Sequence, residues 1–388
     1  MGPFGSDIKV SCFVERGIPV LNGSNLFGTR LKEDSFRYVT PEKADSLKKA
    51  NAYRGDVIVT HRGTLGQIVY IPQNSTQPRY VISQSQFRFR CNDKVIPEYV
   101  VNYFHSHEGQ NKILANASQV GVPALARASS SFRDIEIPVP PLPTQRKIAA
   151  VLGALDDKIE NNRKICANLE AQAQAIFKSW FVDDAKHIRE TVQMQRVFDV
   201  TIGRTPPRKE SEWFSENKDN NHVWVSIADM GSCGAFIFDS SEYLTDEAIR
   251  SFNFKVVPQD TVLLSFKLTV GRVAIAATDL VTNEAIAHLR SSDTRLKEYL
   301  YCYLKQFNYD NLGSTSSIAT AVNSTTIKEM PFVVPEDRAL NAFHQLVKPL
   351  FNQIRVLLFE SRALAATRDA LLPKLMSGEI DVEKVKVA

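Results

Sequence analysis

A long apolar pattern occurs twice in this chain, and this internal repeat limits the possible folds more than any other feature. Segment 140–181 aligns with segment 335–376 at a constant offset of 195 positions. At that offset Leu155 matches Leu350. Self-similarity at a fixed offset indicates a duplicated structural unit. Since strand-like sequence of similar length precedes each copy, we expect two globular domains, each followed by a long helix.

The repeated segments carry heptad patterns. From Ile148 to Trp180 the apolar positions are separated by alternating steps of four and three residues, and the second copy repeats this from Phe343 to Leu375. This spacing predicts two long helices whose narrow apolar stripes pack on each other as in a coiled coil. Two ordinary core helices are the alternative, but such helices rarely keep a strict heptad for so long. The residues expected at the helix–helix interface are Leu152, Leu155, Ile159, Leu169, Ile176, Val347, Leu350, Ile354, Leu357, Leu364 and Leu371.

Polar residues interrupt both apolar stripes. Asn162 and Ser361 occupy stripe positions, where polar side chains set the register of a coiled coil. Arg368 also occupies a stripe position, and the pattern does not explain it.

Proline residues indicate where the helices begin and where they deform. The proline-rich run 137–143 is incompatible with a helix, so Thr144 is expected to cap a helix that starts at Gln145. In the second helix Pro349 predicts a bend and Pro373 predicts a break.

Short apolar runs bounded by turn residues predict strands in both globular stretches. The runs at 55–60 and 66–71 correspond to those at 260–265 and 271–276. The expected fold class is α+β, with two mixed α/β domains joined by two long antiparallel coiled-coil helices in a pseudo-twofold internal repeat. The expected boundaries are domains at 1–140 and 186–335, helices at 141–185 and 336–376, and a tail at 377–388 that packs back toward the first domain.

Composition limits the classes of protein without choosing one. The formal net charge of +4 and the pI near 8.7 are compatible with a nucleic-acid partner, although many other proteins share them. The five cysteines stand far apart without a C-x-x-C pair, which predicts reduced thiols in a cytoplasm, with neither a disulfide framework nor a metal site. No apolar run is long enough to predict a membrane segment.

Several polar loops could contact a ligand. The segments 61–64 and 265–269 follow equivalent strands, and each contains a cation and a hydroxyl next to a glycine-bearing turn. Arginine and lysine bind phosphates and guanine edges, and hydroxyls and amides suit backbone and base contacts. Solvated loops with no ligand are the alternative for any one residue. The candidate DNA-binding residues are His61, Arg62, Thr64, Gln119, Arg127, Arg204, Arg208, Lys209, Lys267, Thr269, Arg272 and Ser316.

Catalytic and cofactor motifs are missing from the chain. The sequence has no G-x-x-x-x-G-K-[ST], G-x-G-x-x-G, H-E-x-x-H or G-x-S-x-G motif, and no Asn-Pro-Pro-aromatic motif of the kind that base methyltransferases use. We therefore expect no catalytic residues and no cofactor in this chain.

Segment 140–149, its continuation at 155–159, and segment 175–183 resemble the central region of type I restriction-modification specificity subunits. Segment 371–380 is similar to that family's C-terminal region, and segment 201–230 resembles the start of one of its target-recognition domains. The resemblance implies a non-catalytic protein that recognises a split double-stranded DNA sequence through two target-recognition domains. It also implies partners: DNA adenine methyltransferase (modification) subunits, which would bring S-adenosylmethionine, and motor-nuclease restriction subunits.

Three other interpretations remain open at this stage. A coiled-coil scaffold without DNA binding would explain the heptads but not the two loop-rich domains. A self-sufficient DNA enzyme disagrees with the missing motifs, and a one-domain reader that dimerises disagrees with the internal duplication.

Overall fold

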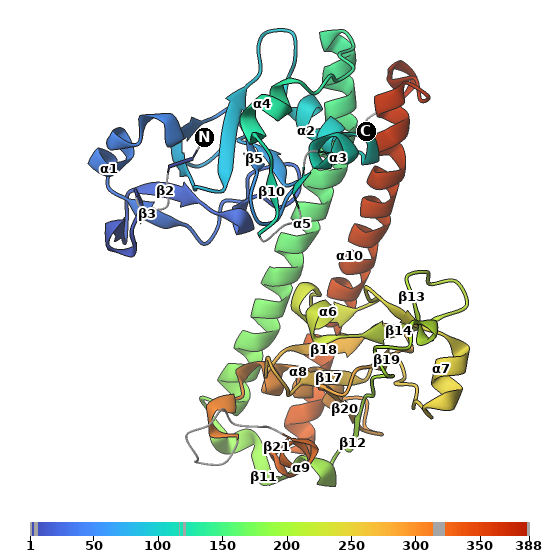
Figure 1. Ribbon diagram of the computed structural model, residues 1–388. Coiled ribbons are helices and arrows are strands. Elements are labelled where there is room, and N and C mark those ends of the chain that lie inside the picture. The colour runs from blue at the N-terminus through green and yellow to red at the C-terminus, as the bar shows by residue number, and fades with distance from the viewer. Residues whose placement is uncertain (1, 4–6, 116, 119–121, 313–322, 386–388) are drawn as a thin grey trace. The chain divides into compact units, whose positions relative to one another are not determined.

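The computed structural model describes residues 2–3, 7–115, 117–118, 122–312 and 323–385. The chain forms two compact units. The first comprises Met1–Asp157 together with Leu364–Ala388, and the second comprises Lys158–Ala363. Each unit combines sheets and short helices with one stretch of α5 (Leu142–Phe181) and one stretch of α10 (Asp337–Ser377) (Figure 1).

The first unit contains two main sheets in the described part of the chain, with strand orders β1-β3-β2-β7-β4 and β6-β5-β8. Its strands are β1 (Phe13–Val14), β2 (Ile18–Leu21), β3 (Arg37–Val39), β4 (Asn51–Tyr53), β5 (Asp56–Thr60), β6 (Ile68–Tyr70), β7 (Arg79–Ile82), β8 (Gln86–Arg90), β9 (Ala117–Ser118) and β10 (Ala124–Leu125). Its shorter helices are η1 (Val10–Cys12), η2 (Gly23–Asn25), α1 (Pro41–Ser46), η3 (Lys48–Ala50), α2 (Pro97–His105), α3 (His107–Leu114), α4 (Ala128–Arg133) and η8 (Val382–Lys384).

The second unit contains sheets of order β12-β20-β17-β18-β15 and β13-β16-β14-β19 and the pair β11-β21, again for the residues described. Its strands are β11 (Ile188–Gln193), β12 (Asp199–Ile202), β13 (Phe214–Ser215), β14 (His222–Val225), β15 (Phe236–Ile237), β16 (Tyr243–Leu244), β17 (Val262–Ser265), β18 (Val273–Ala276), β19 (Val281–Thr282), β20 (Ile286–Arg290) and β21 (Pro331–Pro335). Its shorter helices are η4 (Ala185–His187), η5 (Met194–Arg196), η6 (Ser211–Trp213), α6 (Ile227–Ser232), α7 (Asp246–Ser251), α8 (Leu296–Gln306), η7 (Tyr309–Asn311) and α9 (Ser324–Glu329).

The two units share a common subset of paired strands, although their sheets differ in size. In the first, β5 lies antiparallel between β6 and β8, and β2 pairs in parallel with β7. In the second, β17 lies antiparallel between β18 and β20, and β14 pairs in parallel with β19. A parallel pair and an antiparallel triplet in the same chain order confirm the predicted duplication of a mixed α/β domain.

Helix α5 begins earlier than the proline-rich run predicts. It starts at Leu142, so Thr144 lies inside the first turn and the prediction that it caps the helix is wrong. Proline is tolerated in a first turn, because the amide it lacks has no partner within the helix there. Gln145 is fully buried and fixes this end: its Nε2 donates to Lys94 O at 2.9 Å, and its Oε1 accepts from the Ile96 amide at 3.0 Å.

Helix α10 continues past both of its prolines. It runs unbroken to Ser377, so the predicted break at Pro373 is wrong. Leu372 and Leu375 on either side are buried against Ile148 and Leu152 of α5. Packing of these flanking leucines holds the turn helical, although the proline removes one main-chain hydrogen bond.

Within the second unit α5 and α10 pack antiparallel. Asn162 Nδ2 donates to Glu360 Oε2 at 2.7 Å and to Ser361 Oγ at 3.3 Å, which joins the two polar stripe residues. Further along, Phe177 lies 6.1 Å from Phe343, measured between ring centroids. The packed pair of long helices confirms the predicted coiled-coil arrangement.

The residues predicted for the helix–helix interface belong to both units. All of them are buried or half-buried: Leu152, Leu155, Ile159, Leu169, Ile176, Val347, Leu350, Ile354, Leu357, Leu364 and Leu371.

The structure explains the arginine in the second apolar stripe. Within the first unit, Arg368 Nη1 donates to Asp156 Oδ1 of α5 at 2.8 Å. Arg368 also contacts Asp369, its neighbour in the chain. An opposite charge on the facing helix offsets the cost of partly burying the guanidinium, so the stripe tolerates a cation here.

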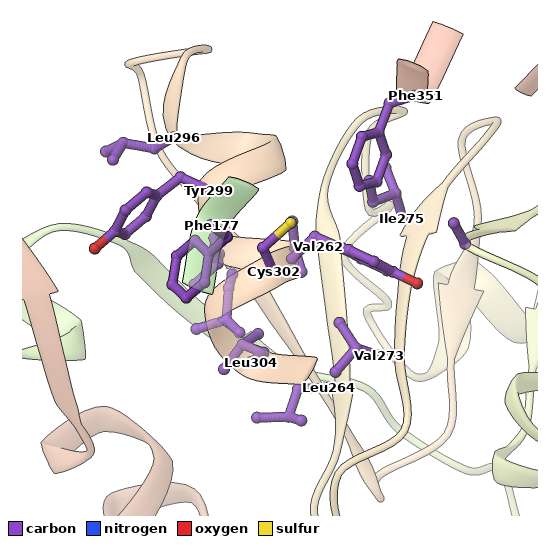
Figure 2. Packing of buried hydrophobic residues seen from close by; sticks show 14 of the residues in the cluster. Phe177, Val262, Leu264, Val273, Ile275, Leu296, Tyr299, Cys302, Leu304 and Phe351 are labelled. Carbon is purple, nitrogen blue, oxygen red and sulfur yellow. The ribbon is translucent and has the colours of Figure 1, made fainter. Parts of the chain in front are cut away.

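The hydrophobic core of the second unit contains a cluster of aromatic rings. Figure 2 shows part of it, with Phe177 of α5 next to Tyr299 of α8 at a centroid separation of 5.1 Å. Fully buried Phe343 of α10 lies 5.5 Å from the Phe181 ring and 6.5 Å from Trp180. These rings join the helix pair to the sheet β12-β20-β17-β18-β15 in one hydrophobic core.

The tail after α10 packs in the first unit. Val382 is 4% exposed and lies in a cluster with Tyr99 of α2 and Ile148 of α5. Ile380 and Val385 pack against the same cluster.

No helix among the described residues has the length and apolar character needed to cross a bilayer.

Candidate nucleic-acid interface

The β5–β6 turn of the first unit, residues 61–67, presents a free cation. Arg62 is exposed, and no ion-pair partner for it occurs among the described residues. Gly63 and Gly66 have φ angles of +90° and +84°, a backbone that glycine adopts readily. Thr64, between them, is exposed.

Strand β10 supports this turn from one side. The Gly63 amide donates to Pro123 O at 2.8 Å, and the Leu125 amide donates to His61 O at 2.9 Å. The structure therefore brings the turn next to the segment that leads to Arg127, which is exposed and has a φ of +48°.

His61 is less available than its neighbour Arg62. Its imidazole is half-buried, with Nε2 at 3.2 Å from Gln84 O, and burial lowers its pKa below the ordinary value. A neutral ring that donates to a main-chain carbonyl holds the turn in place.

The second unit repeats the turn between β17 and β18, over residues 266–272. Lys267 and Thr269 are exposed, and Lys267 has no ion-pair partner within the described part of the chain. Its Nζ lies 5.7 Å from the ring centroid of buried Phe266. Leu268 and Gly271 have φ angles of +59° and +90°.

A buried serine organises the second turn. Ser265 Oγ donates to Thr269 O at 2.6 Å and accepts from the Arg272 amide at 3.0 Å. The Gly271 amide also donates to Ser265 O at 3.0 Å. These bonds join both ends of the turn, so its exposed tip stands on a fixed base.

Arg272 at the end of this turn has an internal partner. Its guanidinium donates to Ile227 O and lies against Gly231, where an added Cβ would come within 2.5 Å of Nη1. Arg272 therefore ties the turn to α6.

The basic loop 203–209 of the second unit is largely occupied by internal contacts. Arg204 Nη1 donates to Phe252 O at 2.8 Å. Arg208 forms an ion pair with Glu242 at 2.9 Å, and its guanidinium carbon lies 4.6 Å from the Trp224 ring centroid. Lys209 is exposed and has no ion-pair partner in the described part of the chain.

The structure therefore divides the predicted lysines and arginines into two groups. The exposed cations without an ion-pair partner among the described residues are Arg62, Arg127, Lys209 and Lys267. Arg204, Arg208 and Arg272 hold the fold of the second unit. Gln119 and Ser316 lie outside the described residues.

Sequence reasoning did not select Leu268, the tip of the second turn. An offset of 205 positions aligns it with Gly63, and a leucine opposite a turn glycine was the signal that could have identified it. Among the residues described, no group of histidine, cysteine, aspartate or glutamate side chains could hold a metal ion.

Comparison with known families assigns the duplicated units. The family model described as type I restriction modification DNA specificity domain matches this chain twice, over residues 17–171 and 189–352. The chain belongs to the type I restriction-modification DNA specificity family. As a specificity subunit it is the DNA-specificity component of such a system, and subunits of this family are non-catalytic.

Two curated relatives and one solved structure show how much of this chain is similar to other specificity subunits. The type I restriction enzyme MjaIX specificity subunit of Methanocaldococcus jannaschii is 27% identical, covering 86% of this chain and 79% of the relative. The HindI specificity subunit of Haemophilus influenzae is 23% identical, covering 84% and 87%. The crystal structure of the type I restriction-modification S subunit from M. genitalium has the same fold, with a TM-score of 0.54 at 15% identity over 95% of this chain and 91% of that one.

Proposed function

We propose that each unit reads one half of a bipartite double-stranded DNA target, and that the turns 61–67 and 266–272 enter the major groove. One observation carries the proposal. The two units present an exposed cation without an ion-pair partner at the same position of the same turn, Arg62 in one and Lys267 in the other. A duplicated reader is suited to a target in two parts.

The chemistry of the turns agrees with readout of DNA. A guanidinium or ammonium group can neutralise a phosphate or donate to the O6 and N7 acceptors of guanine. The neighbouring hydroxyls of Thr64 and Thr269 can donate to either phosphate or base. Since Gly63 has no side chain and a Cβ added there would meet no atom within 4 Å, main chain can approach the DNA closely next to Thr64.

We further infer that adenine-methylating modification subunits and motor-nuclease restriction subunits assemble on this chain. Family membership supports assembly into a type I restriction-modification complex. Val356 and Phe359 of α10 lie one helical turn apart and are 60% and 64% exposed. Neighbouring exposed apolar side chains on a helix favour a surface that another protein covers.

Replacing Lys267 by alanine is expected to weaken recognition of one half-site only, and replacing Arg62 is expected to weaken the other. Each loss should be about 1 to 3 kcal/mol if the side chain contacts a base edge. If it contacts a phosphate instead, the slope of log binding constant against log salt concentration should fall by about one unit, because one counterion fewer is released. A gel-shift series at several salt concentrations, with methylation mapping in a host that carries this chain and its modification subunit, measures both.

The matched control for these substitutions is Lys186→Ala in η4, which removes a cation whose side chain is 85% exposed and which belongs to neither turn segment. It should leave affinity and methylated sites unchanged. A wild-type chain that shows no salt-dependent shift with any DNA would favour the scaffold interpretation over the reader.

We also infer that the predicted tail 377–388, through its described part after α10, completes the first domain. Removal of the tail is expected to speed hydrogen exchange in α2 and β5–β8 more than in the second unit, because the cluster around Tyr99 and Ile148 loses Val382. Lys384→Ala, which changes an 84% exposed side chain in the same tail, is the control. Equal acceleration in both units would contradict the inference.

A further inference from the structure

Leu268 combines two properties that each disfavour a leucine. Its side chain is 98% exposed, and its backbone has a φ of +59°. An apolar side chain that stays in water contributes none of the free energy that burial would provide. A left-handed backbone disfavours any residue with a Cβ and suits glycine.

The first unit shows that the turn itself does not require leucine. At the equivalent position Gly63 has a φ of +90°, and three residues later Gly66 and Gly271 have φ angles of +84° and +90°. The two turns thus have left-handed backbone at the same two positions. Glycine serves at both positions in the first unit, whereas the second unit carries leucine at the tip.

The leucine does not stabilise the turn by packing either. Its side chain is 98% exposed, and the base of the turn is held by the hydrogen bonds of Ser265 to Thr269 and Arg272. Strained residues that the fold does not need occur most often where a protein contacts its ligand.

The neighbour of Leu268 indicates the kind of ligand. Lys267 directly precedes it, is exposed, and has no ion-pair partner among the residues described. A cation next to a projecting apolar side chain matches the edge of a DNA major groove, where phosphates line the rim and the thymine 5-methyl group projects from the base pairs.

We propose that Leu268 is a specificity-determining residue that contacts the 5-methyl group of a thymine in the half-site read by the second unit. The proposal rests on the proposed function. Lys267 fixes the turn on the DNA backbone or a base edge, and Leu268 selects thymine, because cytosine and the purines offer no methyl group at that place. Gly63 gives the first unit no equivalent apolar contact.

The test combines Leu268→Gly with removal of the thymine methyl group. The recognised sequence is first mapped by methylation sequencing, and each thymine position of the second half-site, on either strand, is then replaced by deoxyuridine. Binding of the full chain, assembled with its modification subunits, is measured on each duplex. Loss of one buried methyl group should weaken wild-type binding about threefold to tenfold at one position.

The effects of Leu268→Gly and of removing the thymine methyl group on binding free energy are expected to be non-additive. Leu268→Gly should bind the thymine duplex more weakly than wild type by a similar factor. Replacing that thymine by uracil should cause no further loss of affinity in the variant. The first half-site should be unaffected. The variant should not unfold at a lower temperature than wild type, since glycine adopts this backbone without strain. Val270→Ala, at a 36% exposed apolar position in the same turn, should keep the uracil effect.

The inference would be overturned by unchanged affinity and sequence preference in Leu268→Gly, or by an equal uracil effect in both proteins. A loss of subunit assembly in Leu268→Gly would assign the residue to a protein contact and also contradict it. Failure of the proposed function looks different, because Lys267→Ala would then leave DNA binding unchanged as well.

Discussion

Replacing Phe343 by alanine is expected to destabilise the second unit by about 3 to 5 kcal/mol. The ring is fully buried on α10 and lies between 5.5 and 6.5 Å from the rings of Phe177, Trp180, Phe181 and Tyr299. Removing it deletes edge-on aromatic contacts and leaves a cavity that the surrounding rings cannot fill by small movements. Because α5, α8 and α10 all contribute to this cluster, the helix pair and the domain should loosen together.

Denaturant unfolding of the variant, followed by tryptophan fluorescence, measures this loss. Leu346→Ala on the same helix is the matched control, since that side chain is 51% exposed and its truncation should cost within about 0.5 kcal/mol. Similar losses for the two variants would show that the aromatic cluster does not stabilise the unit as the structure implies.

Acidification is expected to weaken the second unit through His288 of β20. Burial lowers the pKa of this imidazole to about 4. Its Nδ1 lies 2.9 Å from Thr201 Oγ1, and its Nε2 lies 2.7 Å from Thr282 Oγ1. Since the Thr282 hydroxyl donates to Asn283 O at 3.1 Å, its oxygen accepts from Nε2–H, and Thr201 donates to Nδ1. A second proton on the ring would displace the Thr201 donor.

The sign of the effect follows from the depressed pKa. The unfolded chain binds a proton near pH 6.5, whereas the folded unit resists protonation until about pH 4. The stabilisation from the neutral ring is complete above pH 6.5, and it is lost as the pH falls from 6.5 toward 4. The full loss is roughly 3 kcal/mol.

Comparing wild type with His288→Gln isolates this contribution from other acid-sensitive groups. Glutamine keeps one donor and one acceptor but does not titrate, so the gap in unfolding free energy between the proteins should narrow as the pH falls from 7 to 4. The gap is read from urea unfolding at several pH values. A gap that stays constant with pH would show that His288 does not resist protonation in the fold.

The helices and the duplication were predictable because their signals are local and repeated. A heptad stripe depends only on residues a few positions apart, and the fold-defining strand runs at β5, β6, β17 and β18 likewise carry their apolar pattern within themselves. The helix ends were less predictable. The unbroken turn at Pro373 depends on Leu372 and Leu375 packing against α5, which lies far away in sequence.

The two equivalent turns could be located in the sequence, but which of the candidate cations have internal partners could not. The equivalent turns could be found by alignment, and Arg62 and Lys267 project from them. Arg204, Arg208 and Arg272 look equally suited to DNA in the sequence. Their internal partners Phe252, Glu242 and Ile227 are separated from them by 48, 34 and 45 positions, so no local pattern shows that these cations are already occupied.

The sequence by itself determined that the chain is a duplicated pair of mixed α/β domains with long heptad helices, because periodicity and repetition are properties of neighbours along the chain. Only the tertiary structure decided which cations stay free, why Arg368 is tolerated opposite Asp156, and that Leu268 stands exposed where its counterpart is glycine. Ion pairs and exposure depend on groups that folding brings together from distant positions. Asp156 and Arg368, for example, are 212 residues apart.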